Sequence, residues 1–229
     1  KVPEQAERYR KLLRNEAALS GRLRHPNIVR LLDADEEALP PYLVLEYVDG
    51  QPLSAYATPD ALLPVPQVLD IAFKCCNALE YACREGLVHR DIKPANVMLA
   101  KDGDIKLTDF GAALSLRSDA TQLSGLVGSP SYMSPEQVRE HDLTHHSDMF
   151  SLAVVVYELL TGRRPFDGDT DFATLYKISN EAPTPPSLLR ASLPAHVDDV
   201  LLRALAKQPS DRFATWDDFA LALLAAHQS

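Results

Sequence analysis

The sequence predicts an α+β fold, with β-strands gathered near the start of the chain and helices filling most of the rest. Short apolar runs bounded by turn residues, which are typical of strands, lie mainly in the first half. Two long segments, residues 65–84 and 147–162, are instead typical of core helices. This order disfavours a parallel βαβ array.

The opening of the chain predicts one helix and two strands. Residues 3–24 follow a helical pattern, with Pro3 suited to the first turn and HPN at residues 25–27 ending the helix. Residues 28–34 (IVRLLDA) and 41–48 (PYLVLEYV) are then expected to be strands.

The two long helices have recognisable ends. Residues 65–84 repeat apolar side chains at helical spacing, and Gly86 is expected to close that helix. In residues 147–162, Ser147 is the expected N-cap and Gly162 the end. The remainder should be helical, interrupted by the Pro-rich connection APTPPSLLRASLP.

A hairpin is predicted between these helices, because NVMLA and DIKLTDF alternate like strands and flank KDGD. If Asp102 and Gly103 form a two-residue turn, Asn96 faces Asp109 at the open end of the hairpin, about 5 Å away at Cβ. Two such oxygen donors suit Mg²⁺. The pairing leaves open the alternative that both residues only cap strand ends.

Two further groups of charges are unexpected in apolar surroundings. Asp91 and Lys93 lie just upstream of the hairpin, where an acid beside a base could orient a hydroxyl nucleophile and neutralise a migrating phosphoryl group. Glu16 falls on the apolar stripe of the first helix, without a cation three or four residues away. It therefore needs a cation from elsewhere, unless it lies at the solvent edge of the stripe.

Composition limits the classes of partner. The 229 residues have a net charge of −9, which argues against broad binding to nucleic acid or anionic lipid but allows a local basic patch. The three cysteines cluster in one helical stretch, as in a reducing compartment. No apolar run is long enough to cross a bilayer, so we expect a cytoplasmic segment without membrane contact, whose parent protein could carry an anchor elsewhere.

Four motifs, in order, resemble the eukaryotic-like protein kinase superfamily, in its bacterial Ser/Thr form: HRDIKPAN, DFG, SPE and SDMFSLAVVVYELLTGRRPF. The resemblance implies a two-lobed kinase fold. Residues 1–47 would be the remnant of a small lobe that lacks the strands of the Gly-rich loop, and residues 48–229 a mainly helical large lobe. The missing loop leaves nucleotide affinity and turnover open.

The resemblance also implies the roles of the charged residues. Asp91 would accept the proton of the substrate hydroxyl, Lys93 would steady the transferred phosphate, and Asn96 and Asp109 would hold Mg²⁺ against ATP. Further nucleotide contacts are expected from the pair Lys1 and Glu16, from Leu45 guarding the back pocket, from backbone groups of Glu46 and Val48, and from Met98 under adenine.

The implied activity is phosphorylation of Ser and Thr in proteins, favoured by the Lys in DIKPAN and by Ser129, where the family carries a Thr that contacts the catalytic loop. Arg90 suggests activation by a phosphate on the chain itself, with Thr121, Ser124 and Ser118 as the candidate sites.

Two buried contacts are also expected by resemblance. Asp148 would brace the catalytic loop, or simply cap its helix, and Glu136 would pair with Arg212, unless both are surface charges. Two alternatives to a protein kinase stay open: a pseudokinase that acts as a binding scaffold, and a small-molecule phosphotransferase of related fold.

Overall fold

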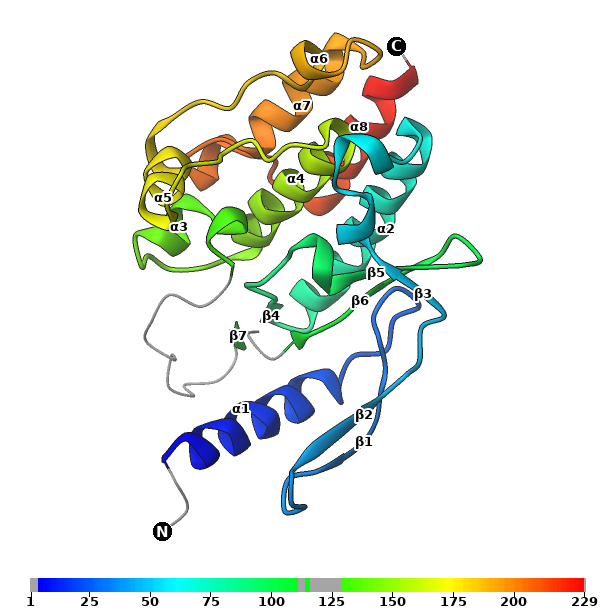
Figure 1. Cartoon of the computed structure of the whole chain (residues 1–229), viewed down its shortest axis with the longest axis vertical. Helices are drawn as coiled ribbons and strands as arrows, with labels where there is room; N and C mark the ends of the chain where they lie inside the picture. Colours follow the sequence, from blue (N-terminus) through cyan, green and yellow to red (C-terminus); the bar gives the residue numbers. More distant parts are fainter. Residues whose placement is uncertain (1–3, 111–113, 116–128, 229) are drawn as a thin grey trace.

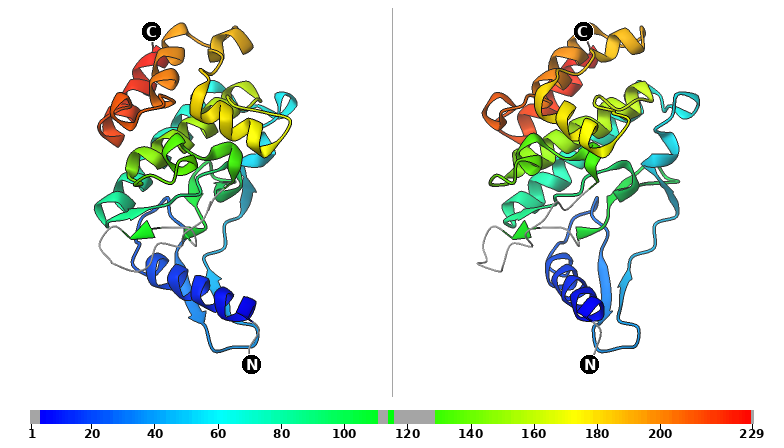
Figure 2. Two further views of the ribbon diagram at one scale, coloured as in Figure 1. Left: turned by 90° about the vertical axis from the view of Figure 1, so that its left-hand side faces the viewer. Right: turned by 60° about the vertical axis from the view of Figure 1, so that its left-hand side comes forward.

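The computed structural model describes residues 4–110, 114–115 and 129–228. Helix α1 (Glu4–Ser20) and the strand pair β1 (Leu31–Asp35) and β2 (Tyr42–Leu45) lie together at one end of the molecule, apart from a larger helical body (Figure 1). The two turned views of Figure 2 show the same separation. A small sheet lies between these two parts.

The end near the N-terminus has the predicted order of one helix and two strands. Strands β1 and β2 are antiparallel, with Leu31 opposite Leu45 and Asp35 opposite Tyr42. The predicted helix is shorter than expected, because α1 ends at Ser20 and the chain then turns toward the first strand.

The small sheet has three antiparallel strands in the order β3, β5, β6, and the predicted hairpin forms two of them. Its predicted register is wrong by one residue. The N–H of Ala100 donates to the carbonyl of Asp104 at 2.8 Å, so three residues rather than two form the turn, with Gly103 at φ 87°. Asn96 consequently pairs with Thr108, whose N–H donates to its carbonyl at 2.9 Å, instead of with Asp109. The strands are β3 (Gly50–Pro52), β5 (Val97–Ala100) and β6 (Ile105–Leu107), and a separate pair is formed by β4 (Leu87–Val88) and β7 (Leu114–Ser115).

Helix α4 (His145–Thr161) runs through the middle of the helical body and is buried along nearly its whole length. It packs against α2 (Val65–Arg84), whose bounds match the prediction. Within the described ranges, no helix is long and apolar enough to cross a membrane. The other helices are α3 (Pro135–Val138), α5 (Asp171–Asn180), α6 (Pro186–Leu189), α7 (Ala195–Ala204) and α8 (Trp216–Gln228), with 3-10 turns at Leu53–Tyr56, Pro59–Ala61, Pro94–Asn96, Pro130–Tyr132 and Pro209–Asp211.

The ends of α4 (His145–Thr161) confirm one prediction and correct another. Gly162 closes the helix in the left-handed region at φ 71°, and a Cβ there would lie 2.5 Å from the backbone nitrogen of Pro59. The N-cap is Thr144, not Ser147, because the Thr144 hydroxyl accepts a bond from the backbone N–H of His146. Ser147 is buried and donates instead to Glu136.

Candidate active site

The loop from His89 to Asn96 is held from below by the buried carboxylate of Asp148. The backbone N–H groups of His89 and Arg90 donate to its two oxygens at 2.7 and 2.9 Å. These bonds hold Arg90 in the left-handed region, at φ 71°, where a non-glycine residue needs such support. The predicted bracing of this loop by Asp148 is confirmed. Burial raises the pKa of Asp148, while the electrostatic effect of the His89 ring and the two backbone donors oppose that rise.

Asp91 is the centre of a hydrogen-bond cluster at the surface of this loop. Lys93 Nζ donates to Asp91 Oδ2 at 2.7 Å and to the Ser129 hydroxyl at 3.0 Å. The backbone N–H of Ser129 donates to Asp91 Oδ1 at 3.1 Å, so the predicted contact of Ser129 with the loop is confirmed. Asn96 Nδ2 donates to Asp91 Oδ2 at 3.1 Å and to its backbone carbonyl at 2.9 Å. The fold therefore brings together all three predicted catalytic residues.

His89 positions this loop, a role that the sequence analysis did not assign. Its side chain is fully buried, and its ring centroid lies 4.5 Å from that of Phe110. The ring Nδ1 accepts the backbone N–H of Asp91 at 3.3 Å, which assigns the proton to Nε2, 3.0 Å from the Thr108 carbonyl. His89 thus ties the loop to the segment that leads to Asp109. Its place between the apolar Val88 and a charged loop was the available signal.

Asn96 and Asp109 remain at the same end of the hairpin despite the corrected register, because Asp109 directly follows Thr108. The Asn96 amide uses its nitrogen to bind Asp91, which leaves the oxygen as the atom suited to a cation. Asp109 is exposed and adopts the left-handed region at φ 60°. One amide oxygen and one accessible carboxylate fit Mg²⁺, which favours a few hard oxygen ligands and retains water.

Glu16 of α1 is half-buried and close enough to Asp109 for their charges to interact. Burial raises the pKa of Glu16, and the negative charge of Asp109 adds to that rise. Two carboxylates near each other would be stabilised by a cation. The predicted partner, Lys1, lies outside the described residues, so this pair stays a prediction.

Of the predicted adenine contacts, Leu45 ends β2, Glu46 and Val48 lie in the connection that follows it, and Met98 lies in β5. Glu46 donates its backbone N–H to the Arg30 carbonyl at 2.8 Å. Its carboxylate lies 2.8 Å from Lys106 Nζ, and this hydrogen bond is the main cause of the lowered pKa of Glu46. Lys106 is a second residue that the sequence analysis missed. Leu45 is exposed, and Val48 and Met98 are half-buried.

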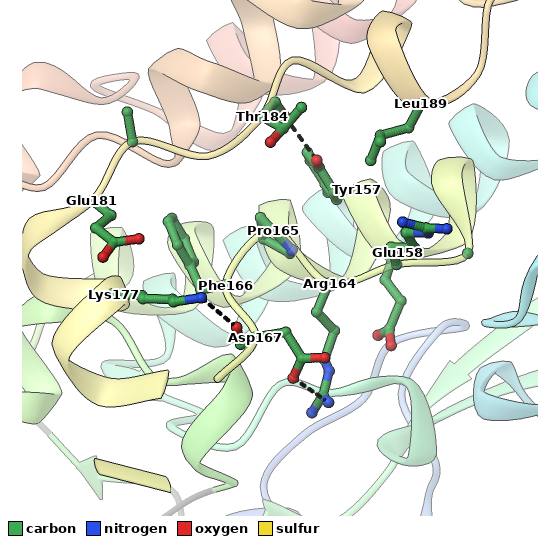
Figure 3. Close-up of a pocket in the computed structure, with 13 residues that line it drawn as sticks. Tyr157, Glu158, Arg164, Pro165, Phe166, Asp167, Lys177, Glu181, Thr184 and Leu189 are labelled. Carbon is green, nitrogen blue, oxygen red and sulfur yellow. Dashed lines mark hydrogen bonds and ion pairs between the residues drawn. The ribbon is translucent and has the colours of Figure 1, made fainter. Parts of the chain in front are cut away.

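A cavity of about 670 Å³ lies between α4, α5 and the segments that connect α4 to α6 (Figure 3). Arg164 lines the cavity and donates to the Asp167 carboxylate at 2.6 Å, while Lys177 Nζ donates to the Asp167 carbonyl at 2.8 Å. The buried Glu158 carboxylate lines the cavity and accepts the Tyr132 hydroxyl at 2.7 Å. Tyr132 belongs to the segment that begins at Ser129, so this bond links a residue of the cavity wall to the segment that contacts Asp91.

The predicted pair of Glu136 and Arg212 is confirmed, and both side chains are buried rather than on the surface. Arg212 donates to both carboxylate oxygens, at 2.7 and 2.9 Å, and to the His146 carbonyl at 2.7 Å. Burial by itself raises the pKa of Glu136, but the hydrogen bonds and charge of Arg212 outweigh it and hold that pKa below its usual range. This pair joins α3 to the segment before α8.

The fold and this cluster of residues are those of a protein kinase domain. The family model described as the protein kinase domain matches residues 1–222, so the chain belongs to that family. Members use ATP as the phosphoryl donor, typically with Mg²⁺, and act on proteins. The resemblance inferred from the four motifs is confirmed.

Individual relatives are bacterial. The serine/threonine-protein kinase PknB of Mycolicibacterium smegmatis is 38% identical over 228 residues, which cover 96% of this chain and 36% of that protein. The probable serine/threonine-protein kinase PknB of Corynebacterium glutamicum is 39% identical over 223 residues, covering 93% of this chain and 34% of that protein. The chain thus spans about a third of the length of these relatives.

Proposed function

We propose that this chain transfers the γ-phosphoryl group of ATP to Ser and Thr hydroxyls of protein substrates. The observation that carries the proposal is the Asp91 cluster, in which one carboxylate is oriented by Lys93, Asn96 and the backbone of Ser129. A carboxylate fixed in this way can accept the proton of an incoming hydroxyl. The names of the bacterial relatives agree with this activity.

Lys93 has a second role in this proposal. Its ammonium lies between the Asp91 carboxylate and the Ser129 hydroxyl, where it can neutralise charge on the phosphoryl group as that group moves toward the acceptor. Asn96 Oδ1 and the Asp109 carboxylate would hold Mg²⁺, which neutralises the terminal phosphates of the nucleotide when bound. Proton acceptance and charge neutralisation then fall to different side chains of one loop.

The nucleotide and the protein substrate would occupy opposite sides of Asp91. We assign adenine to the connection formed by Leu45, Glu46 and Val48, with Met98 beneath it and with Lys1 and Glu16 acting on the phosphates. The small lobe would then be residues 1–47 and the large lobe residues 48–229. The acceptor segment would run along Ser129 to Tyr132, beside the cavity in Figure 3.

We further infer a cytoplasmic location and regulation by phosphorylation of this chain. The regulatory candidates Thr121, Ser124 and Ser118 lie outside the described residues, so their role stays a prediction. Support for the regulation comes from Arg90, whose half-buried guanidinium has an Nε without a hydrogen-bond partner among the described residues and could bind a phosphate group. Intact-mass spectrometry after incubation with ATP should detect added phosphate, and none at these three sites would contradict the inference.

The activity is tested with radiolabelled ATP and Mg²⁺ on the full-length protein, with acceptor peptides that carry Ser, Thr or Tyr. We expect labelling of Ser and Thr peptides, and a loss of about 10²-fold or more in Asp91→Asn. Asp142→Asn, an exposed aspartate outside the cluster, is the matched control and should retain activity. Labelling of small molecules only would favour a small-molecule phosphotransferase. No labelling with intact ATP binding would favour a pseudokinase.

A further inference from the structure

A second cavity, of about 400 Å³, is lined by an unusual concentration of basic side chains. It lies between the segment that follows α1, the end of β2 and strand β6, and it contains no residue of the Asp91 loop. Among the residues that the structure describes, its charged and titratable lining consists of Arg24, His25, Arg30, Lys106 and a single carboxylate, Glu46. Three permanent cations face one anion here, in a chain whose net charge is −9.

The one carboxylate is already committed to other groups. Glu46 accepts Lys106 Nζ at 2.8 Å and the backbone N–H of Arg30 at 3.2 Å. The Arg24 guanidinium donates to the carbonyl of Leu23 at 2.9 Å, and among the described residues neither Arg24 nor Arg30 forms an ion pair. Two guanidinium groups therefore border the cavity with donors that match phosphate oxygens.

His25 adds a donor and reports on the charge of the cavity. Its Nδ1 accepts the backbone N–H of Asn27 at 3.0 Å, which leaves the proton on Nε2, and its ring packs against Tyr81 at 5.4 Å. Burial is the main cause of its lowered pKa, Lys106 lowers it further, and Asp104 acts in the opposite direction. An anion placed in the cavity would oppose the effect of Lys106 and raise this pKa.

We propose that this cavity is a binding site for a small phosphorylated molecule, held by Arg24 and Arg30 and completed by Lys106 and His25. The volume is in the range of small-ligand sites. A polymeric anion is disfavoured, because the neighbouring cavity shares Glu46 and Lys106 and adds three carboxylates, those of Asp49, Asp102 and Asp104, against one further cation, Lys101, which already pairs with Asp49. These groups would repel an extended nucleic acid or an anionic membrane.

Such a ligand would act on the nucleotide through Glu46, a consequence that rests on the proposed function. A phosphate group that binds Lys106 competes with the Glu46 carboxylate for this lysine, and the backbone of Glu46 belongs to the connection assigned to adenine. Binding at the two sites should therefore be coupled, and the coupling must be reciprocal. We expect the small anion to change the affinity for ATP, which is measured with Mg²⁺ once in the absence and once in the presence of the anion.

The test uses inorganic pyrophosphate as the probe, in a magnesium-free buffer of low ionic strength, with the full chain. Calorimetry gives the affinity, and the ring resonances of His25 in NMR spectra locate the site. We expect saturable binding with a raised pKa of His25, and affinity lower by about tenfold or more in Arg24→Ala/Arg30→Ala, because this variant removes two charged hydrogen-bond donors.

Arg22→Ala is the matched control, because Arg22 is exposed and does not line the cavity. It should retain the affinity within about twofold, whereas an equal loss in both variants would mean a general charge effect and would overturn the proposal. Binding that leaves the His25 resonances unchanged would overturn it as well. Tighter binding of a phosphoserine peptide than of pyrophosphate would refute the assignment to a free small molecule. Binding at the cavity with unchanged ATP affinity would refute the coupling alone.

Discussion

Replacing Arg212 with methionine should destabilise the fold far more than the loss of an ordinary surface charge. The guanidinium is fully buried and makes both bonds to the Glu136 carboxylate, a further bond to the His146 carbonyl, and one from Nε to the Ala206 carbonyl at 2.9 Å. The variant leaves Glu136 buried with the hydroxyl of Ser147 at 2.8 Å but without a cation among the described residues. Breaking a buried pair on one side costs about 3–5 kcal/mol.

Urea unfolding followed by circular dichroism measures this loss directly. Thermal unfolding provides a second measurement. For a chain of this size, a loss of 1 kcal/mol lowers the melting temperature by about 2–4 °C, so we expect the melting temperature of Arg212→Met to be lower by about 6–20 °C. The matched control is Lys101→Met, which removes an exposed pair with Asp49 and should cost less than about 1 kcal/mol. If Arg212→Met costs no more than this control, the reasoning from burial is wrong.

The same pair predicts a defined dependence on pH. Because Arg212 lowers the pKa of Glu136 in the folded state, the pair contributes its full stability above the pKa of the unfolded carboxyl, and that contribution is lost as the pH falls through the lower folded value. The difference in unfolding free energy between wild type and Arg212→Met should therefore be largest at neutral pH and shrink in acid. A difference that is constant from pH 7 to pH 3 would contradict this explanation.

Three further predictions concern other parts of the domain. Asp148→Ala leaves one buried and one partly buried backbone N–H group without their acceptor and should cost about 2–4 kcal/mol in urea unfolding, so a loss below about 1 kcal/mol would refute the bracing role. Ser129→Ala should lower the rate of peptide phosphorylation by about tenfold while Ser129→Thr retains it, because only threonine keeps the hydroxyl that binds Lys93; equal rates would contradict this. Burial, with the charges of two arginines, lowers the pKa of Lys207 to about 8. Between that pH and the ordinary pKa of lysine, the folded chain binds fewer protons than the unfolded chain, so the free energy of unfolding should rise with pH. Lys207→Met should remove this rise.

Sequence patterns within one segment predicted the local structure well. The bounds of α2 match residues 65–84, because its apolar spacing and the glycine that follows act within a few turns of helix. Gly162 ends α4 for a similarly local reason, as its left-handed backbone favours glycine. The motifs also placed Asp91, Lys93 and Asn96 in one loop, where chain connectivity alone keeps them near each other.

Contacts between distant segments were predicted less well. The hairpin was expected to have a two-residue turn, and the extra residue moved Asn96 from Asp109 to Thr108. Both turn lengths are compatible with KDGD, so the choice depends on how the strands pack on the core. The cap of α4 changed in the same way, because Glu136, eleven residues away, binds the Ser147 hydroxyl and leaves capping to Thr144.

The sequence by itself determined the kinase family, the order of its elements and the residues of the Asp91 loop. Only the tertiary structure decided that His89 ties this loop to the Asp109 segment, that Glu136 and Arg212 are buried, and that four basic side chains share one cavity. The physical reason is that helix formation and turn chemistry depend on neighbours along the chain. Burial, hydrogen bonding across the fold and the local electrostatic potential depend on groups that folding alone brings together.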